Sequence, residues 1–177
     1  MTKKQYNSTF YMTLAPDMED YLLEQIPDNC NPKIYTELLT EDNLEKDTEI
    51  LGVFTDSKVS SKVFEKLPNL KQIVTLATGF DNVDLNEAKK RNVPVCNVPA
   101  YGDDTVAEYT IGLIISLIRN INKSIDKVSE GEFNCHGLRG LDLKDKKIGI
   151  IGTGHIGEKV IKKLSSFEVD FLAFDPY

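Results

Sequence analysis

Lys147-Ile148-Gly149-Ile150-Ile151-Gly152-Thr153-Gly154-His155-Ile156-Gly157 is the stretch that decides the fold of this chain. Its first half is the continuous apolar run of a buried parallel strand, and its second half is a glycine-rich turn that opens a helix. The glycines follow G-x-G-x-x-G: Gly152 permits the tight turn, Gly154 lets the backbone approach a pyrophosphate, and Gly157 lets helix and strand pack closely. We expect a phosphate at the helix N-terminus, in contact with His155, rather than acid–base chemistry by that histidine.

The residues that follow strengthen this interpretation. The sequence predicts a helix over 156–167 and an apolar strand over 169–174 that ends in Asp175. This acid lies 18 residues after Gly157, near the spacing at which a carboxylate accepts from the ribose 2′-OH of NAD and repels the 2′-phosphate of NADP. The alternative is a plain β-α-β turn with an acid at its end. We favour nucleotide binding, because the strand, turn, helix and second strand follow in order.

Composition excludes several classes of function. The chain has 177 residues, 41% of them apolar, and a formal net charge of -7, so it predicts a globular protein with little attraction to nucleic acid or to an anionic membrane. Its three cysteines are widely spaced, which predicts neither a disulfide framework nor a metal site and fits a reducing cytoplasm. We expect no signal peptide, because residues 1–7 are polar, and no membrane span.

Upstream of the glycine turn, short β-rich runs alternate with helical stretches, which is typical of parallel α/β architecture. Five such runs in about ninety residues predict a flavodoxin-like doubly wound sheet, whose ligands gather at the carboxyl ends of the strands. The predicted strands are 9–14, 33–36, 50–54, 70–76 and 94–98, and the predicted helices are 17–26, 60–67 and 84–91; the acidic segment 37–49 is ambiguous.

Two loops follow predicted strand ends. In 77–84, Gly79 frees the backbone, Asp84 can cap the next helix, and the backbone N–H groups could hold an anion such as a carboxylate. The second loop is 98–104. On the residues alone, an ordinary connecting turn is the favoured interpretation of each. His136 has no evident partner for metal binding or catalysis, so we expect a solvent or packing histidine.

A long apolar helix is predicted over 105–121. Thr105-Val106-Ala107-Glu108 forms a capping box, and ten of the seventeen residues are apolar and cover more than one face. Such a helix is buried on several sides. It lies either between two domains or as an arm clasped by another subunit, and we favour the arm.

Taken together, these motifs resemble the D-isomer-specific 2-hydroxyacid dehydrogenases. Ala77-Thr78-Gly79-Phe80-Asp81-Asn82-Val83-Asp84 is similar to the family's substrate-carboxylate loop. Asn97-Val98-Pro99-Ala100-Tyr101-Gly102 and Thr105-Val106-Ala107-Glu108 resemble its interdomain crossing and arm helix. Gly137-Leu138-Arg139-Gly140-Leu141-Asp142-Leu143-Lys144-Asp145-Lys146 resembles the segment before the cofactor motif, and Asp175-Pro176-Tyr177 the end of the second cofactor-domain strand. The resemblance covers almost the whole chain from about Ile50.

The resemblance implies an enzyme that passes hydride between NAD and a D-2-hydroxy or 2-keto acid. Residues 1–103 would be a substrate domain, and 104–177 a dimerisation arm helix with an incomplete Rossmann domain. Thr78 and Gly79 would hold the substrate carboxylate, with Tyr101 near the substrate. The cofactor contacts would be Val106 near the nicotinamide, and Gly152, Gly154, His155, Ile156, Gly157 and Asp175 around the pyrophosphate and ribose. The partners would be a small 2-hydroxy or 2-keto acid and a second copy bound through helix 105–121.

The resemblance also exposes a departure. In this family an Arg, a Glu and a His carry the chemistry, and all three lie after the strand that ends here at Asp175. No residue of this sequence corresponds to them. We therefore expect the 177-residue polypeptide to be a truncated member of this lineage, with no catalytic residues and no turnover. Two alternatives stay open: a non-catalytic, NAD-responsive interaction protein of the same lineage, and a Rossmann unit for another ligand such as S-adenosylmethionine, which the upstream motifs disfavour.

Overall fold

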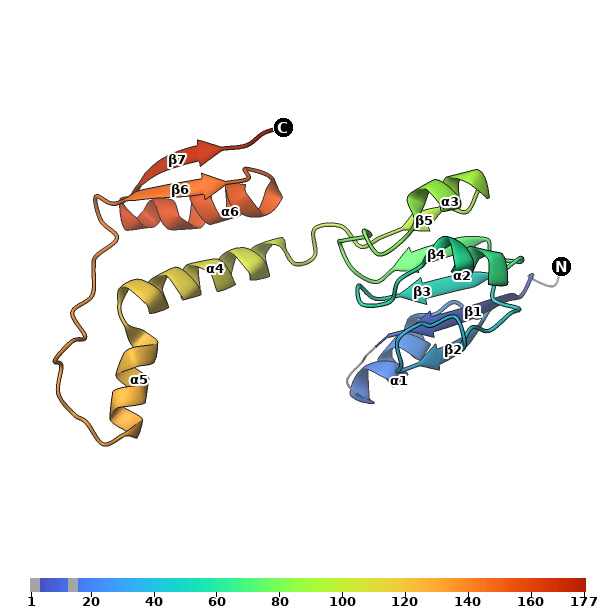
Figure 1. Cartoon of the computed structure of the whole chain (residues 1–177), viewed down its shortest axis with the longest axis horizontal. Helices are drawn as coiled ribbons and strands as arrows, with labels where there is room; N and C mark the ends of the chain where they lie inside the picture. The colour runs from blue at the N-terminus through green and yellow to red at the C-terminus, as the bar shows by residue number, and fades with distance from the viewer. Residues whose placement is uncertain (1–3, 13–15) are drawn as a thin grey trace. The chain divides into compact units, whose positions relative to one another are not determined.

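The computed structural model describes residues 4–12 and 16–177 of the chain (Figure 1). Contacts divide the chain into two compact units, Met1–Pro99 and Ala100–Tyr177. The boundary falls just before the long apolar helix that the sequence predicts. Each unit has its own hydrophobic core.

The first unit is built on a five-stranded sheet. Its strands are β1 (Tyr6–Tyr11), β2 (Cys30–Tyr35), β3 (Ile50–Val53), β4 (Gln72–Thr75) and β5 (Val95–Cys96). They lie in the order β2-β1-β3-β4-β5, and every neighbouring pair is parallel. This 2-1-3-4-5 order is that of the flavodoxin-like sheets. The predicted fold class is therefore confirmed; the predicted first strand began later, at residue 9, and its positions 13 and 14 lie outside the described residues.

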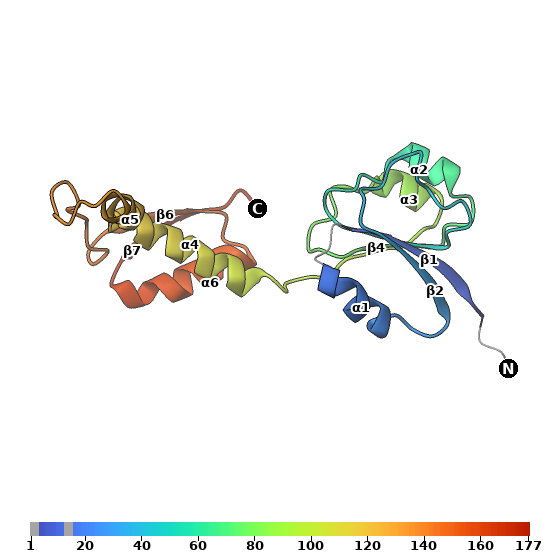
Figure 2. The ribbon, with the colours of Figure 1, turned by 90° about the horizontal axis from the view of Figure 1, so that it is seen from below.

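Helices cover both faces of this sheet. Figure 2 shows α1 (Pro16–Gln25) on one side and α2 (Ser61–Lys66) with α3 (Leu85–Lys90) on the other. The buried core on the α2–α3 side combines alternate strand residues, Leu51, Val53 and Ile73, with helix residues such as Phe64. Asp84 caps α3 as predicted, because its Oδ1 accepts the Glu87 N–H at 3.0 Å.

The ambiguous acidic segment 37–49 contains no helix or strand. Two tyrosines hold it against the sheet. The Tyr11 hydroxyl, fully buried, donates to the Asn43 carbonyl at 2.5 Å, and the Tyr35 hydroxyl donates to the Glu45 carboxylate. The two rings stack with centroids 5.1 Å apart. The segment is thus an irregular loop fixed by side-chain hydrogen bonds, a pattern that hydrophobic periodicity cannot reveal.

The second unit contains α4 (Asp103–Ile118), α5 (Ile121–Ser129), β6 (Lys147–Ile151), α6 (His155–Leu164), the 3₁₀ turn η1 (Ser165–Phe167) and β7 (Asp170–Phe174). β6 and β7 pair in parallel. Both ribbon views show α4 alongside α6 (Figures 1 and 2). Ala107 of α4 and Val160 and Leu164 of α6 form the buried centre, and apolar residues of α4 and both strands pack around it.

Both predicted ends of the apolar helix are wrong. The helix begins at Asp103 after Gly102, so Thr105 lies inside it and no side chain caps its first turn. It ends at Ile118, because Asn120 adopts a left-handed backbone (φ 54°) and its side chain donates to the Arg139 carbonyl. Ile121 therefore belongs to α5. Local residue types suggested a capping box, but the chain enters the helix two residues earlier.

Within residues 4–12 and 16–177, no helix is long and apolar enough to cross a membrane.

Candidate functional site

The glycine turn has the geometry that its sequence predicts. Gly152 has a φ of 90°, a conformation that favours glycine. A Cβ on Gly157 would collide with the carbonyl oxygen of Gly152, so α6 can approach the turn only without a side chain there. A Cβ on Gly154 would meet nothing within 4 Å. The turn therefore has open space in front of its middle glycine, where a pyrophosphate would approach the backbone.

The turn leads directly into the N-terminus of α6. The Glu158 N–H donates to the Gly154 carbonyl at 2.9 Å, as the first hydrogen bond of the helix. The N–H groups of the three preceding residues, His155 to Gly157, precede that ladder and carry the positive end of the helix dipole. This is the arrangement that binds phosphate at helix N-termini. The residues present therefore fit a dinucleotide pyrophosphate.

Asp175 follows β7 directly and lies beside the turn. Its Oδ2 accepts the Thr153 N–H at 2.6 Å and the Thr153 hydroxyl at 3.1 Å, while its Oδ1 accepts the Tyr177 N–H at 3.1 Å. These bonds, first of all that from the Thr153 N–H, hold the pKa of the Asp175 carboxyl below its usual value. A carboxylate offers about four acceptor positions. Three of them are used here, which leaves room for one ribose hydroxyl.

Sequence reasoning missed Thr153 as the partner of Asp175. The signal was available, since Thr153 is the only hydroxyl inside the glycine motif. It also missed Asp103. The Asp103 Oδ2 lies 3.8 Å from His155 Nδ1, and the Asp103 side chain is only 9% exposed, whereas that of His155 is 86% exposed. Asp103 is the first residue of α4, and no local pattern connects it with a turn 52 residues later.

The predicted carboxylate loop follows β4 in the first unit. The Thr78 hydroxyl donates to the Val98 carbonyl at 3.0 Å, and Asn97 Nδ2 donates to the Thr78 carbonyl at 2.8 Å. Asn82 Nδ2 donates to the carbonyls of Phe54 and Ser57. These bonds tie the loop to the segments after β3 and β5, while Gly79 is exposed and faces open space. The loop therefore presents backbone at the carboxyl edge of the sheet.

The two remaining predicted site residues lie at the start of the second unit. Tyr101 is 63% exposed and precedes α4, and Val106 is exposed in its first turn. Val106 shares α4 with Asp103, whereas Thr78 and Gly79 belong to the first unit.

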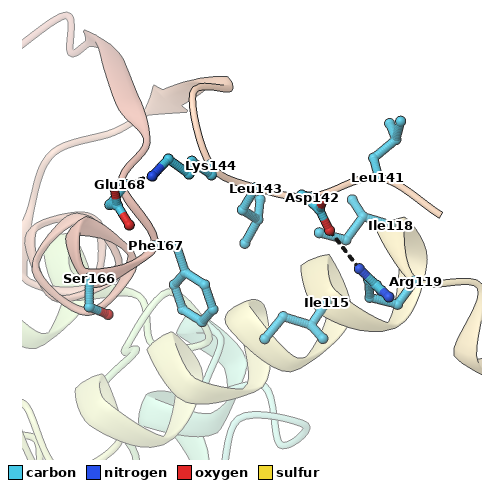
Figure 3. A pocket seen from close by; sticks show the side chains of 10 residues that line it. All are labelled: Ile115, Ile118, Arg119, Leu141, Asp142, Leu143, Lys144, Ser166, Phe167 and Glu168. Carbon is cyan, nitrogen blue, oxygen red and sulfur yellow. Dashed lines mark hydrogen bonds and ion pairs between the residues drawn. The ribbon is translucent and has the colours of Figure 1, made fainter.

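Two cavities of the second unit lie at opposite ends of β6. One of about 310 Å³ adjoins the glycine turn and is lined by residues including Thr110, Ile150, Gly152 and Ile156. The other, of about 370 Å³, lies before β6 (Figure 3). Its apolar floor includes Ile115, Leu143 and Phe167, and its rim holds the ion pairs Arg119–Asp142 (2.7 Å) and Lys144–Glu168 (2.8 Å). The second cavity is separate from the phosphate site.

The described residues contain no group of three or more His, Cys, Asp or Glu side chains that could hold a metal ion. His136 is exposed, and its backbone is held by Asn134 and Lys127.

Comparison with known proteins gives consistent matches. A 2-hydroxyacid dehydrogenase homolog of Haemophilus influenzae is 34% identical over 171 residues, which are 94% of this chain and 52% of that relative. The apo-structure of D-lactate dehydrogenase from Escherichia coli has a TM-score of 0.79 and 32% identity over 97% of this chain and 55% of that one. The D-lactate dehydrogenase of Aquifex aeolicus, complexed with NAD and lactic acid, has a TM-score of 0.81 and 28% identity, covering 96% and 51%.

The chain thus spans about half the length of these relatives. The family model described as D-isomer specific 2-hydroxyacid dehydrogenase, catalytic domain, matches residues 9–171, which is most of the chain. With the parallel 2-1-3-4-5 sheet and the glycine turn already described, this match shows that the chain belongs to the D-isomer specific 2-hydroxyacid dehydrogenase family.

Proposed function

We propose that this chain supplies the substrate-carboxylate loop and the adenosine half of the cofactor site of an NAD-dependent oxidoreductase. The enzyme would act on D-2-hydroxy acids and 2-keto acids. The observation that carries the proposal is the turn in which Gly157 packs on the Gly152 carbonyl, with a helix N-terminus in front of it. The family membership and the NAD-complexed relative from Aquifex aeolicus support it.

Each predicted residue then has one task. When bound, NAD supplies the hydride chemistry. Gly152 and Gly154 let the backbone approach the pyrophosphate, the N-terminal N–H groups of α6 at His155 and Ile156 bind it, and Asp175 accepts from the ribose. Val106 lines the nicotinamide side. The N–H groups of Thr78 and Gly79 hold the substrate carboxylate, and Tyr101 lies near the substrate. We propose residues 1–103 as the substrate domain and 104–177 as the arm helix with part of the cofactor domain.

The 177-residue polypeptide alone is expected to show no turnover. Reduction of a keto acid needs a cation that polarises the carbonyl and a group that donates a proton. Loop 77–84 and residues 97–99 contain no Arg, Lys or His, so these strand ends bind a carboxylate without supplying either group. An assay of NADH oxidation with pyruvate, hydroxypyruvate and 2-ketoisocaproate tests this, and a robust rate with any of them would contradict it.

Binding tests the two half-sites separately. Addition of NAD should shift the amide resonances of Gly152 to Gly157, and oxamate, an inert 2-keto acid analogue, those of Thr78 and Gly79. We expect weak NAD affinity, because one β-α-β unit contacts mainly the adenosine half. Silent amides at both sites, even at high ligand concentration, would refute the proposed function.

We further propose that the chain forms a homodimer and resides in the cytoplasm. Tyr109, Leu113 and Leu117, spaced by four residues, are exposed on α4, and Ile121, Ile125 and Val128 are exposed on α5. Exposed apolar side chains gathered on a helix are typical of an interaction site. All three cysteines are free, which fits a reducing compartment.

The same exposed apolar residues are also compatible with the alternative function, that of a non-catalytic, NAD-responsive interaction protein of this lineage. The discriminating measurement is the molar mass in solution with and without NAD. A mass that changes with NAD favours the alternative, whereas a dimer indifferent to NAD favours a structural arm.

A further inference from the structure

We propose that Asp103 and His155 make phosphate binding at the glycine turn depend on proton uptake: in the bound state the imidazole is cationic, donating one N–H to the phosphate and the other to the Asp103 carboxylate. The proposal rests on the dinucleotide site proposed above and adds a regulation to it. In the family resemblance His155 is only a phosphate contact, and Asp103 has no assigned role.

The two side chains are brought together by packing between helices. Asp103 opens α4 and His155 opens α6. The helices pack through Ala107, Val160 and Leu164, all buried. This contact places the Asp103 Oδ2 3.8 Å from His155 Nδ1, slightly beyond hydrogen-bond distance. The His155 side chain is exposed and the Asp103 side chain is buried, so any movement that closes this gap is made by the imidazole.

The number of N–H donors that the imidazole needs then decides the protonation state of His155 in the bound state. A neutral imidazole has one donor and one acceptor nitrogen, whereas the cation has two donors. Phosphate oxygens and a carboxylate are both acceptors. His155 placed between them can satisfy both only as the cation, and both bonds are then charge-assisted. Binding therefore takes up a proton from solvent when the imidazole starts neutral, so a lower pH strengthens binding.

The charged neighbours leave Asp103 as the acid that acts on His155. On α4, Asp104 is paired with Lys159 and Lys163, and Glu108 with Lys163 at 2.9 Å. Asp175 is engaged by Thr153. Among the described residues, no Lys or Arg forms an ion pair with Asp103. The N-terminal dipole of α6 opposes a cation at His155, and the first-turn Glu158 offsets part of that effect.

NAD⁺ is the suitable probe, because its pyrophosphate diester keeps a constant charge across this pH range. Its affinity for the 177-residue chain is measured from the amide shifts of Gly154 and Ile156 at about pH 6 and about pH 8. Adenosine, which lacks phosphate, is the ligand control. The variants are Asp103→Asn, His155→Gln and, as a matched control on the same helix, Glu108→Gln, which removes an acid that faces Lys163 instead.

The wild-type chain should bind NAD⁺ about two- to fivefold more tightly at the lower pH, the size expected for an ion pair with one exposed partner. Asp103→Asn should lose most of that ratio. His155→Gln should abolish the ratio, and Glu108→Gln should keep it. A full ratio in Asp103→Asn, or no ratio in the wild type, overturns the inference alone. Unchanged amides at both pH values overturn the proposed cofactor site as well.

Discussion

At the scale of single residues, the glycine turn depends on a close backbone contact that leaves no room for a side chain at Gly157. Gly157 packs directly on the Gly152 carbonyl oxygen, and Gly152 itself has a left-handed φ of 90°. A Cβ at Gly157 must displace backbone, because the atom it meets is the Gly152 carbonyl oxygen; at Gly152 a side chain would meet no atom within 4 Å, and the cost comes from the left-handed backbone alone. Gly149 in β6 provides the contrast, since a Cβ there would meet nothing within 4 Å.

We therefore predict different effects for two glycine-to-alanine changes within residues 147–157, one in the turn motif and one in β6. Gly157→Ala should destabilise the second unit by about 1–3 kcal/mol, the usual cost of overpacking. It should also shift the amides of the turn. Gly149→Ala should cost much less. Thermal unfolding, followed through amide resonances of β6 and α6, measures both. Equal stability of the two variants would mean that the turn does not require close helix packing.

Residue roles that depend on local backbone could be predicted, and roles that depend on packing could not. The glycines and the Asp84 cap follow from chain geometry within a few residues, and the structure places them as expected. Thr153 meets Asp175 only because β7 pairs with β6 in one register. Asp103 meets His155 only because α4 packs on α6. A single sequence carries no periodic signal for either pairing.

At the scale of elements, β1 and β2 hold the segment 37–49 through their tyrosines. Burial raises the pKa of Tyr11 to about 12, and the hydrogen bond to Glu45 raises the pKa of Tyr35. A raised folded-state pKa means that the folded chain keeps its proton more tightly than the unfolded chain. The stabilisation from Tyr11 is thus complete below about pH 10 and is lost as the pH rises toward about 12.

Tyr11→Phe should therefore remove a stabilisation that depends on pH. Below about pH 10 the variant should be less stable than the wild type by about 1–2 kcal/mol. The reason is that the Asn43 carbonyl and the Glu45 N–H lose their hydrogen bonds to the Tyr11 hydroxyl. Toward pH 12 the difference from the wild type should shrink. Urea unfolding at about pH 8 and about pH 11 checks this. Tyr21→Phe on α1, where the side chain is exposed, is the control. A Tyr11→Phe variant as stable as this control would contradict the anchoring role.

Element boundaries show the same division between local and tertiary causes. The strands β3, β4 and β5 were predictable because each contains a short apolar run between turn residues, although the ends of the five strands moved by up to three residues. The start of β2 was not, because Cys30 to Lys33 carry no apolar run. The end of α4 could not be predicted in this way. It stops where the loop around Arg139 to Leu141 packs on it, with the Leu141 N–H donating to the Ile118 carbonyl at 2.9 Å. That loop lies twenty residues farther along the chain.

At the scale of the whole molecule, the second unit leaves much apolar surface in solvent. α4 turns Ala107, Ile111 and Ile114 toward α6. Its other face carries Tyr109, Leu113 and Leu117, which are 67%, 53% and 78% exposed. The sequence showed that α4 is apolar on several sides, but only the packing shows which side is covered within the chain.

The uncovered side of α4 should bind a second copy of the chain. Leu117→Asp would place an unpaired charge in that interface, so the dimer dissociation constant should rise at least about tenfold, because burial of an uncompensated charge is strongly unfavourable. Sedimentation equilibrium over a range of concentrations measures it. Leu38→Asp, an exposed leucine of the first unit, should leave the mass unchanged. A wild-type chain that stays monomeric at every concentration, or a dimer that tolerates Leu117→Asp, would show that the exposed face of α4 is covered in another way.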